Sequence, residues 1–128
     1  MPYVSPAEAL NRMAVAIPAL RRKTGPPPWR VPIVATADLR VVLIAWEPGF
    51  RTVPHVHPRA DEVFHVLRGR ALFRIGSAEP RVVGPGTILL APHGTWHDIA
   101  VTGEEPLLLL AALAPNEEAT DETIEGTG

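Results

Sequence analysis

The side chains of this sequence best suited to chemistry are three histidines and one glutamate near its middle: His55, His57, Glu62 and His97. On a β-strand, residues i and i+2 project from the same face, so His55 and His57 would converge on one point. If a short turn returns the chain as the neighbouring strand, Glu62 comes opposite this pair, and His97 can complete the site from a third strand. This spacing predicts a metal site.

The ligand types restrict the metal. Three neutral imidazoles and one carboxylate suit divalent Mn, Fe, Ni or Zn, and also Co or Cu, whereas Ca and Mg prefer shells made of oxygen. The chain contains no cysteine, so thiolate ligands, disulfides and a cysteine nucleophile are excluded. We therefore expect one divalent transition metal ion per chain, held by histidine and carboxylate.

The elements that must position these ligands are predicted to be strands. From Val31 to Leu113, short aliphatic and β-branched runs are separated by Gly, Pro and Asp, which is typical of an antiparallel all-β domain. Nine short strands predict a sandwich or a barrel. They are expected at residues 31–36, 39–46, 51–56, 62–67, 71–75, 81–83, 87–91, 97–101 and 107–112.

The segments on either side of this β region have a different composition. Ser5-Pro6-Ala7-Glu8 is a capping-box pattern that predicts a short N-terminal helix from Pro6 towards Ile17, and a proline-rich connector follows at residues 25–28. After Leu113 the chain becomes polar and acidic. The expected organisation is a helix and connector over residues 1–30, a barrel over 31–114, and an acidic flexible tail, or an arm laid on the surface, over 115–128.

Length and charge exclude several classes of partner. A chain of 128 residues suffices for one domain. Its 12 basic and 14 acidic side chains do not give it the excess of positive charge that nucleic-acid binding requires. The longest apolar run of the β region and tail, Pro106 to Pro115, is about half of what a membrane-spanning helix needs. We expect a cytoplasmic protein whose partner is a small-molecule substrate, with no nucleic acid and no membrane.

Two sequence patterns resemble the motifs of the cupin superfamily. Gly49-x5-His55-x-His57-x4-Glu62-x6-Gly69 is similar to the first cupin motif, and Gly86-x5-Pro92-x-Gly94-x2-His97 to the second, with sixteen residues between them. The chain departs from the family at Val101, where Asn is usual, but that residue is not a metal ligand in the family. The resemblance implies a double-stranded β-helix, or jelly-roll barrel, with the metal inside near one mouth. It assigns the ligand roles to the three histidines and the glutamate, and it implies a homodimer formed through the outer sheet.

Other aromatic and basic residues have more than one interpretation. The default for the large aromatics is core packing, with some lining a mainly apolar pocket: Trp46, Phe64, Phe73 and Trp96. His93 lies in a turn before His97, either at the pocket rim or in a solvated loop. Strand alternation places His65 on the face opposite Glu62. Arg51 and Arg59 flank the ligand segment, where they either meet an anionic substrate or lie at the surface.

The reaction is less determined than the fold, because cupins include dioxygenases, isomerases, lyases, decarboxylases, storage proteins and sensors. Isomerases and lyases need a positioned acid or base besides the metal, and the only lysine and tyrosine, Lys23 and Tyr3, lie outside the predicted barrel. Glu47, Asp98 and His93 are weak local candidates. We therefore expect a metal-dependent dioxygenase acting on a small enolisable or anionic molecule. The alternatives are a non-redox isomerase or lyase acting on a sugar or organic acid, and a non-catalytic binding module.

Overall fold

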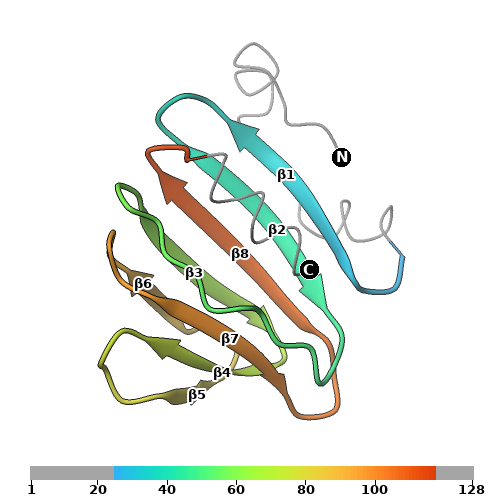
Figure 1. Ribbon diagram of the computed structural model, residues 1–128. Coiled ribbons are helices and arrows are strands. Elements are labelled where there is room, and N and C mark those ends of the chain that lie inside the picture. Colours follow the sequence, from blue (N-terminus) through green and yellow to red (C-terminus); the bar gives the residue numbers. More distant parts are fainter. Residues whose placement is uncertain (1–24, 118–128) are drawn as a thin grey trace.

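The structure, a computed structural model, describes residues 25–117. The predicted N-terminal helix and residues 118–128 of the predicted tail lie outside this part of the chain. The described residues contain no helix and form eight strands (Figure 1): β1 (Trp29–Ala35), β2 (Arg40–Trp46), β3 (Asp61–Arg68), β4 (Arg70–Ile75), β5 (Arg81–Val83), β6 (Ile88–Ala91), β7 (His97–Thr102) and β8 (Leu107–Ala114).

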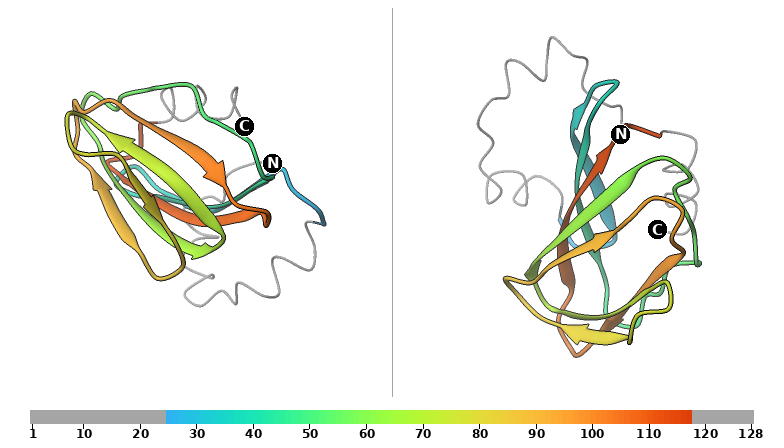
Figure 2. Two further views of the ribbon diagram at one scale, coloured as in Figure 1. Left: turned by 90° about the horizontal axis from the view of Figure 1, so that it is seen from below. Right: turned by 90° about the vertical axis from the view of Figure 1, so that its left-hand side faces the viewer.

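The strands form two antiparallel sheets. The large sheet has the order β1-β2-β8-β3-β6, and the small sheet has the order β5-β4-β7. The two sheets lie against each other, as the views of Figure 2 show. Side chains from both fill the space between them, with Ile44 and Leu109 from the large sheet and Phe73 and Ile99 from the small one in a single buried cluster. The all-β double-stranded arrangement expected from the sequence is therefore confirmed.

Strand alternation decides which side chains enter this core. Along β2, Val42, Ile44 and Trp46 point into the space between the sheets, whereas Leu43 and Ala45 pack in a second cluster on the opposite face of the large sheet. Both faces of β2 are thus apolar, which explains why its sequence, RVVLIAW, reads as a nearly continuous hydrophobic run.

The strand predicted at residues 51–56 is wrong. This segment runs beside β7 but meets it only through the isolated bridges Arg51↔Ala100 and His55↔His97. Two local features interrupt the ladder: Pro54 has no N–H to donate, and the Thr52 hydroxyl accepts the backbone N–H of Ile99 at 2.9 Å. The segment is an irregular edge whose attachment to β7 nevertheless brings His55 next to His97.

The first and last strands differ slightly from the predicted ones. β1 begins at Trp29, two residues before the predicted strand 31–36, and β8 continues to Ala114, two residues beyond the predicted strand 107–112 and at the predicted end of the barrel. The three residues after β8 are docked on the barrel, because the Asn116 side chain donates to the carbonyl of Thr36 at 3.0 Å and a Glu117 carboxylate oxygen accepts the backbone N–H of Arg59 at 2.6 Å. Within residues 25–117, there is no helix with the length and apolar character needed to span a membrane.

Candidate metal centre

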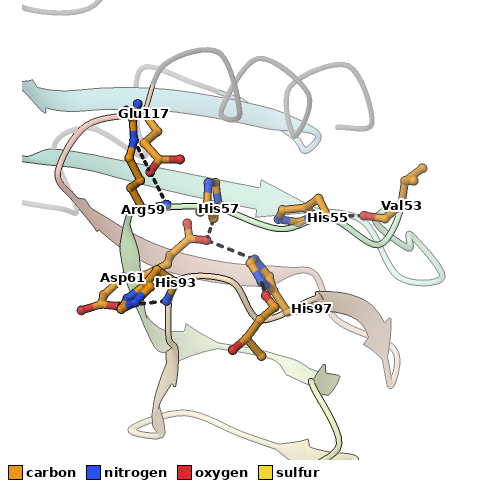
Figure 3. A network of polar contacts seen from close by, with 10 residues as sticks. Val53, His55, His57, Arg59, Asp61, His93, His97 and Glu117 are labelled. Carbon is orange, nitrogen blue, oxygen red and sulfur yellow. Dashed lines mark hydrogen bonds and ion pairs between the residues drawn. The ribbon is translucent and has the colours of Figure 1, made fainter.

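The three histidines and the glutamate singled out from the sequence converge inside the barrel. One potential ligand atom from each of the four residues lies within 4.8 Å of the others. The ring centroids of His55 and His97 are 4.1 Å apart, and each lies 5.5 Å from that of His57. The labelled side chains of Figure 3 show the three imidazoles turned toward one region. All four side chains are buried: His55, His57, Glu62 and His97.

Different elements supply these side chains. Glu62 lies near the start of β3 and His97 is the first residue of β7, whereas the first two histidines come from the irregular segment before β3. The turn between β6 and β7 is attached to this segment, because Gly94 donates its N–H to the carbonyl of His57 at 2.8 Å. This bond and the His55↔His97 bridge hold the two ligand-bearing segments together.

Two of the imidazoles are oriented through the nitrogen that faces away from the cluster. Nδ1 of His55 lies 2.9 Å from the carbonyl of Val53, and Nδ1 of His97 lies 3.3 Å from the carbonyl of Thr95. A carbonyl only accepts hydrogen bonds, so Nδ1–H is the donor, and in the neutral ring Nε2 carries the lone pair. This is the arrangement that presents a neutral histidine to a metal ion.

Glu62 is the anionic member of the cluster. Its Oε1 lies 3.1 Å from His57 Nε2 and 3.2 Å from His97 Nε2. Burial raises the pKa of Glu62, but its hydrogen bond with His57 and its close approach to both histidines outweigh this effect and lower its pKa to about 2. The carboxylate is therefore ionised at neutral pH. Burial, followed by the proximity of His97, lowers the pKa of His55, which keeps its imidazole neutral.

The residues present fit a divalent metal ion. Nε2 of His97 is buried and makes no hydrogen bond, although it faces a carboxylate oxygen. Donor atoms bound to one ion at about 2.1 Å are separated from one another by about 3 to 4 Å, so the cluster needs shifts of less than about 1 Å to surround an ion. Metal binding requires an ionised carboxylate, which Glu62 provides, and imidazoles bind a metal ion in their neutral form. The cluster can hold one metal ion.

A small cavity adjoins the cluster. Its volume is about 10 Å³, room for roughly one water molecule. His55 and Glu62 form part of its wall, and Trp46 and Phe64, two of the aromatics expected near the pocket, also line it. The remaining lining residues are two arginines and five aliphatic residues: Arg30, Arg40, Val42, Ile44, Ile99, Ala111 and Leu113.

Several other residues singled out from the sequence lie elsewhere. Phe73 is buried against Phe64, with ring centroids 5.4 Å apart, and faces a different hollow. Trp96 is 59% exposed, so the expectation of core packing is wrong for this residue, which lies in the turn just before β7. His93 is exposed, and its Nδ1 lies 3.0 Å from an oxygen of Asp61. His65 is half-buried on the outer face of β3.

The arginines near the ligands are not the ones that sequence reasoning selected. Arg59 is 84% exposed and pairs with Glu117, and Arg51 lies 3.9 Å from Asp98. Arg30 and Arg40 line the cavity instead. The sequence did contain an indication that Arg40 points inward. Side chains alternate between the two faces of a strand, and Arg40 is an even number of residues from Trp46, so both lie on the same face of β2.

Two facing antiparallel sheets that enclose three histidines and a glutamate define a double-stranded β-helix with a candidate metal centre. The family model described as "Cupin domain" matches residues 42–113, more than half of the chain. The chain belongs to the cupin family. It is also similar to germin-like protein 4-1 of Oryza sativa subsp. japonica, with 30% identity over 93 residues, which cover 66% of this chain and 37% of the relative. The chain thus spans less than half the length of this curated relative.

Solved structures extend the comparison. BH2720 from Bacillus halodurans superimposes with a TM-score of 0.74 and 25% identity, over 91% of this chain and 88% of the other. A recombinant oxalate oxidase in complex with glycolate has a TM-score of 0.57 and 25% identity, over 62% and 43%. A structure of the DMSP lyases RdDddP and RnDddQII has a TM-score of 0.56 and 30% identity, over 62% and 40%. Similar cupin structures therefore include both an oxidase and lyases.

Proposed function

We propose that this cupin is a metal-dependent oxidoreductase of the dioxygenase type that acts on a small anionic or enolisable organic molecule. The observation that carries the proposal is the set of ionisable groups around the cavity. Among the described lining residues these are Arg30, Arg40, His55 and Glu62. Arginine stays protonated at all ordinary pH values, and the other two are candidate metal ligands. Among the described residues of this lining there is no separate group for proton transfer, which favours chemistry carried by the metal.

The metal and the protein would have different tasks. A redox-active divalent ion would be held by His55, His57, Glu62 and His97, and it would supply the redox chemistry with dioxygen. The carbonyls of Val53 and Thr95 orient the imidazoles of His55 and His97. The apolar wall that Phe64 and Ile99 contribute limits the access of water.

The similarity to oxalate oxidase supports the proposal, since that enzyme was crystallised with glycolate, a small carboxylate. The likeness covers the barrel and only 43% of that chain, so the shared part is the scaffold around the site.

The proposal is tested by oxygen consumption. The purified chain is loaded separately with Fe²⁺, Mn²⁺, Ni²⁺ or Zn²⁺ and mixed with small carboxylic acids, diketones and flavonols in an oxygen electrode. We expect substrate-dependent uptake with at least one redox-active ion, none with Zn²⁺, and none for His97→Ala under the same loading. Uptake by no ion with any of these compounds would count against the proposal.

A non-redox lyase or isomerase is the second candidate, favoured by the similarity to the DMSP lyases. Here the metal would act as a Lewis acid, so Zn²⁺ would support turnover. The two candidates are separated by following product formation by NMR under nitrogen. Turnover without oxygen in the Zn²⁺-loaded protein would select the lyase or isomerase.

Association into a homodimer is also part of the proposal. β6 forms an edge of the large sheet, and its outer face exposes Ile88 at 67% and Leu90 at 53%. Val63 of β3, 40% exposed, pairs with Leu90 in register and extends the apolar surface. Burial between two copies would remove this surface from water. Sedimentation velocity is expected to give a dimer for the full chain and a monomer for Ile88→Glu.

A further inference from the structure

We propose that Glu117 is a positioning residue for the candidate metal centre. Residues 115–117, called the C-terminal strap below, follow β8 and hold the ligand loop, residues 55–60, which carries His55 and His57. The inference deepens the proposed function and rests on it for the presence of a metal ion. It assigns a task to a buried carboxylate that lies outside the ligand cluster.

His57 depends on its backbone for its position more than the other two histidines do. A backbone carbonyl orients both His55 and His97 through Nδ1, whereas Nδ1 of His57 is buried without a hydrogen-bond partner. The Nε2 atom of His57 lies 3.1 Å from Oε1 of Glu62. The direction in which the His57 imidazole points is therefore largely set by the backbone of the ligand loop.

The backbone of the ligand loop is held at two points on either side of Pro58 in the sequence. Before Pro58, the carbonyl of His57 accepts the N–H of Gly94 at 2.8 Å. Pro58 itself has no N–H, so Arg59 is the first residue after His57 with a backbone donor. The N–H of Arg59 donates to Oε1 of Glu117 at 2.6 Å, and Figure 3 shows this contact near His57. Glu117 thus fixes the backbone two residues from a candidate metal ligand.

The contact between Glu117 and the backbone is shielded from water. The side chain of Glu117 is 6% exposed, whereas that of Arg59 is 84% exposed. The ion pair between them, at 3.7 Å, reaches into solvent and contributes little. A hydrogen bond from a backbone N–H to a buried carboxylate is charge-assisted, and it offsets part of the cost of withdrawing the carboxylate from water. The loop is therefore held through its backbone N–H, and the Arg59 side chain is not needed for this.

The C-terminal strap is anchored beside the metal ligands. It begins where β8 ends, and Leu113 near that end pairs with Glu62 of β3. Asn116 binds the turn between β1 and β2, because its backbone N–H donates to the carbonyl of Ala37 at 3.2 Å and its side chain donates to the carbonyl of Thr36 at 3.0 Å. In the large sheet, β2 and β3 lie on either side of β8. The strap therefore links the turn before β2 to the ligand loop before β3.

The Mn²⁺ affinity of the full chain tests the inference, measured by competition with a fluorescent chelator. Glu117→Ala removes the acceptor and should weaken Mn²⁺ binding about tenfold, the lower end of the range for groups that orient metal ligands. Glu117→Gln keeps a neutral acceptor oxygen on a side chain of the same length and should recover most of the loss. Arg59→Ala is the matched control, because it retains the backbone N–H and should bind Mn²⁺ like the wild type.

Electron paramagnetic resonance separates positioning from a general loss of stability. At saturating Mn²⁺, Glu117→Ala should change the zero-field splitting of the bound ion, since His57 is no longer held in one direction, whereas Arg59→Ala should keep the wild-type spectrum. If circular dichroism shows that Glu117→Ala does not fold, Glu117→Asp replaces it. Its carboxylate is one methylene closer to the backbone, and the expected loss of Mn²⁺ affinity is about threefold or more.

Three results would overturn the inference: Mn²⁺ affinity within about twofold of the wild type in the folded Glu117 variant, an equal loss in Arg59→Ala, or no Mn²⁺ binding by the wild type. Weaker Mn²⁺ binding by Glu117→Ala, without oxygen uptake by the wild type with any metal, would contradict the proposed oxidoreductase while supporting the positioning role. Oxygen uptake by the wild type, with unchanged Mn²⁺ affinity in Glu117→Ala, would do the reverse.

Discussion

Replacing Glu62 by glutamine removes the negative charge from the candidate metal centre and retains its shape. In the structure, the two neighbouring histidines lower the pKa of this carboxylate from 4.5 to about 2 despite complete burial. The difference corresponds to roughly 3 kcal/mol of preference for the charged form. A divalent cation brings at least as much positive charge to the same oxygens, so Glu62→Gln should weaken Mn²⁺ binding by about 100-fold or more.

The assay is a competition between the protein and a fluorescent chelator at pH 7.5, with circular dichroism to confirm folding. Asp61→Asn is the control, because it removes the adjacent carboxylate, which is exposed and pairs with His93 outside the cluster. Its Mn²⁺ affinity should match the wild type. Affinity within threefold of the wild type for Glu62→Gln, or an equal loss for Asp61→Asn, would refute the reasoning.

Three further predictions concern single groups. His97→Ala should lose most bound metal, measured as ions per chain after dialysis, whereas His65→Ala, on the outer face of β3, should retain it; equal retention by both would contradict the site. Burial lowers the pKa of His55 below 6.5, so protonation of its imidazole increasingly competes with metal binding as the solution becomes more acidic than this. Mn²⁺ affinity should therefore fall as the pH decreases from 6.5 to 5 in calorimetric titrations, and an increase would show the opposite sign. Gly69→Ala should destabilise the fold by at least about 2 kcal/mol in urea unfolding, since Gly69 has a φ of 80° and an added Cβ would collide with the backbone of Pro106; an unchanged midpoint would argue against this turn geometry.

The sequence carried enough information to place most strands, because alternation and glycine or proline punctuation are local signals. The segment around His55 was misjudged for a reason that is not local. Whether Thr52 and Pro54 interrupt a ladder depends on which groups of β7 lie opposite them, and Ile99 lies 47 positions further along the chain. His55 and His57 still meet His97, since two isolated bridges suffice to align the segments.

The ligand cluster was also easier to predict than its surroundings. Histidine and glutamate residues at the spacing of the two motifs predict a metal site from the sequence alone. An arginine at the start of a strand, in contrast, looks like a surface residue until the pairing of its strand with the neighbouring strands is known. The pairing of both Arg40 and Glu62 with Leu113 places the arginine inside. Trp96 is the opposite case, a residue predicted to be buried that is exposed. Its aromatic side chain next to the ligand His97 suggested core packing, but it is exposed just before β7.

The most direct test of the central claim is the metal content of the purified full chain, measured by plasma mass spectrometry after dialysis against Mn²⁺, Fe²⁺, Ni²⁺ or Zn²⁺. The account predicts about one ion per chain for the wild type with at least one of these metals and far less for His97→Ala. A wild-type protein that retains no metal, or a His97→Ala variant that retains as much as the wild type, would contradict it.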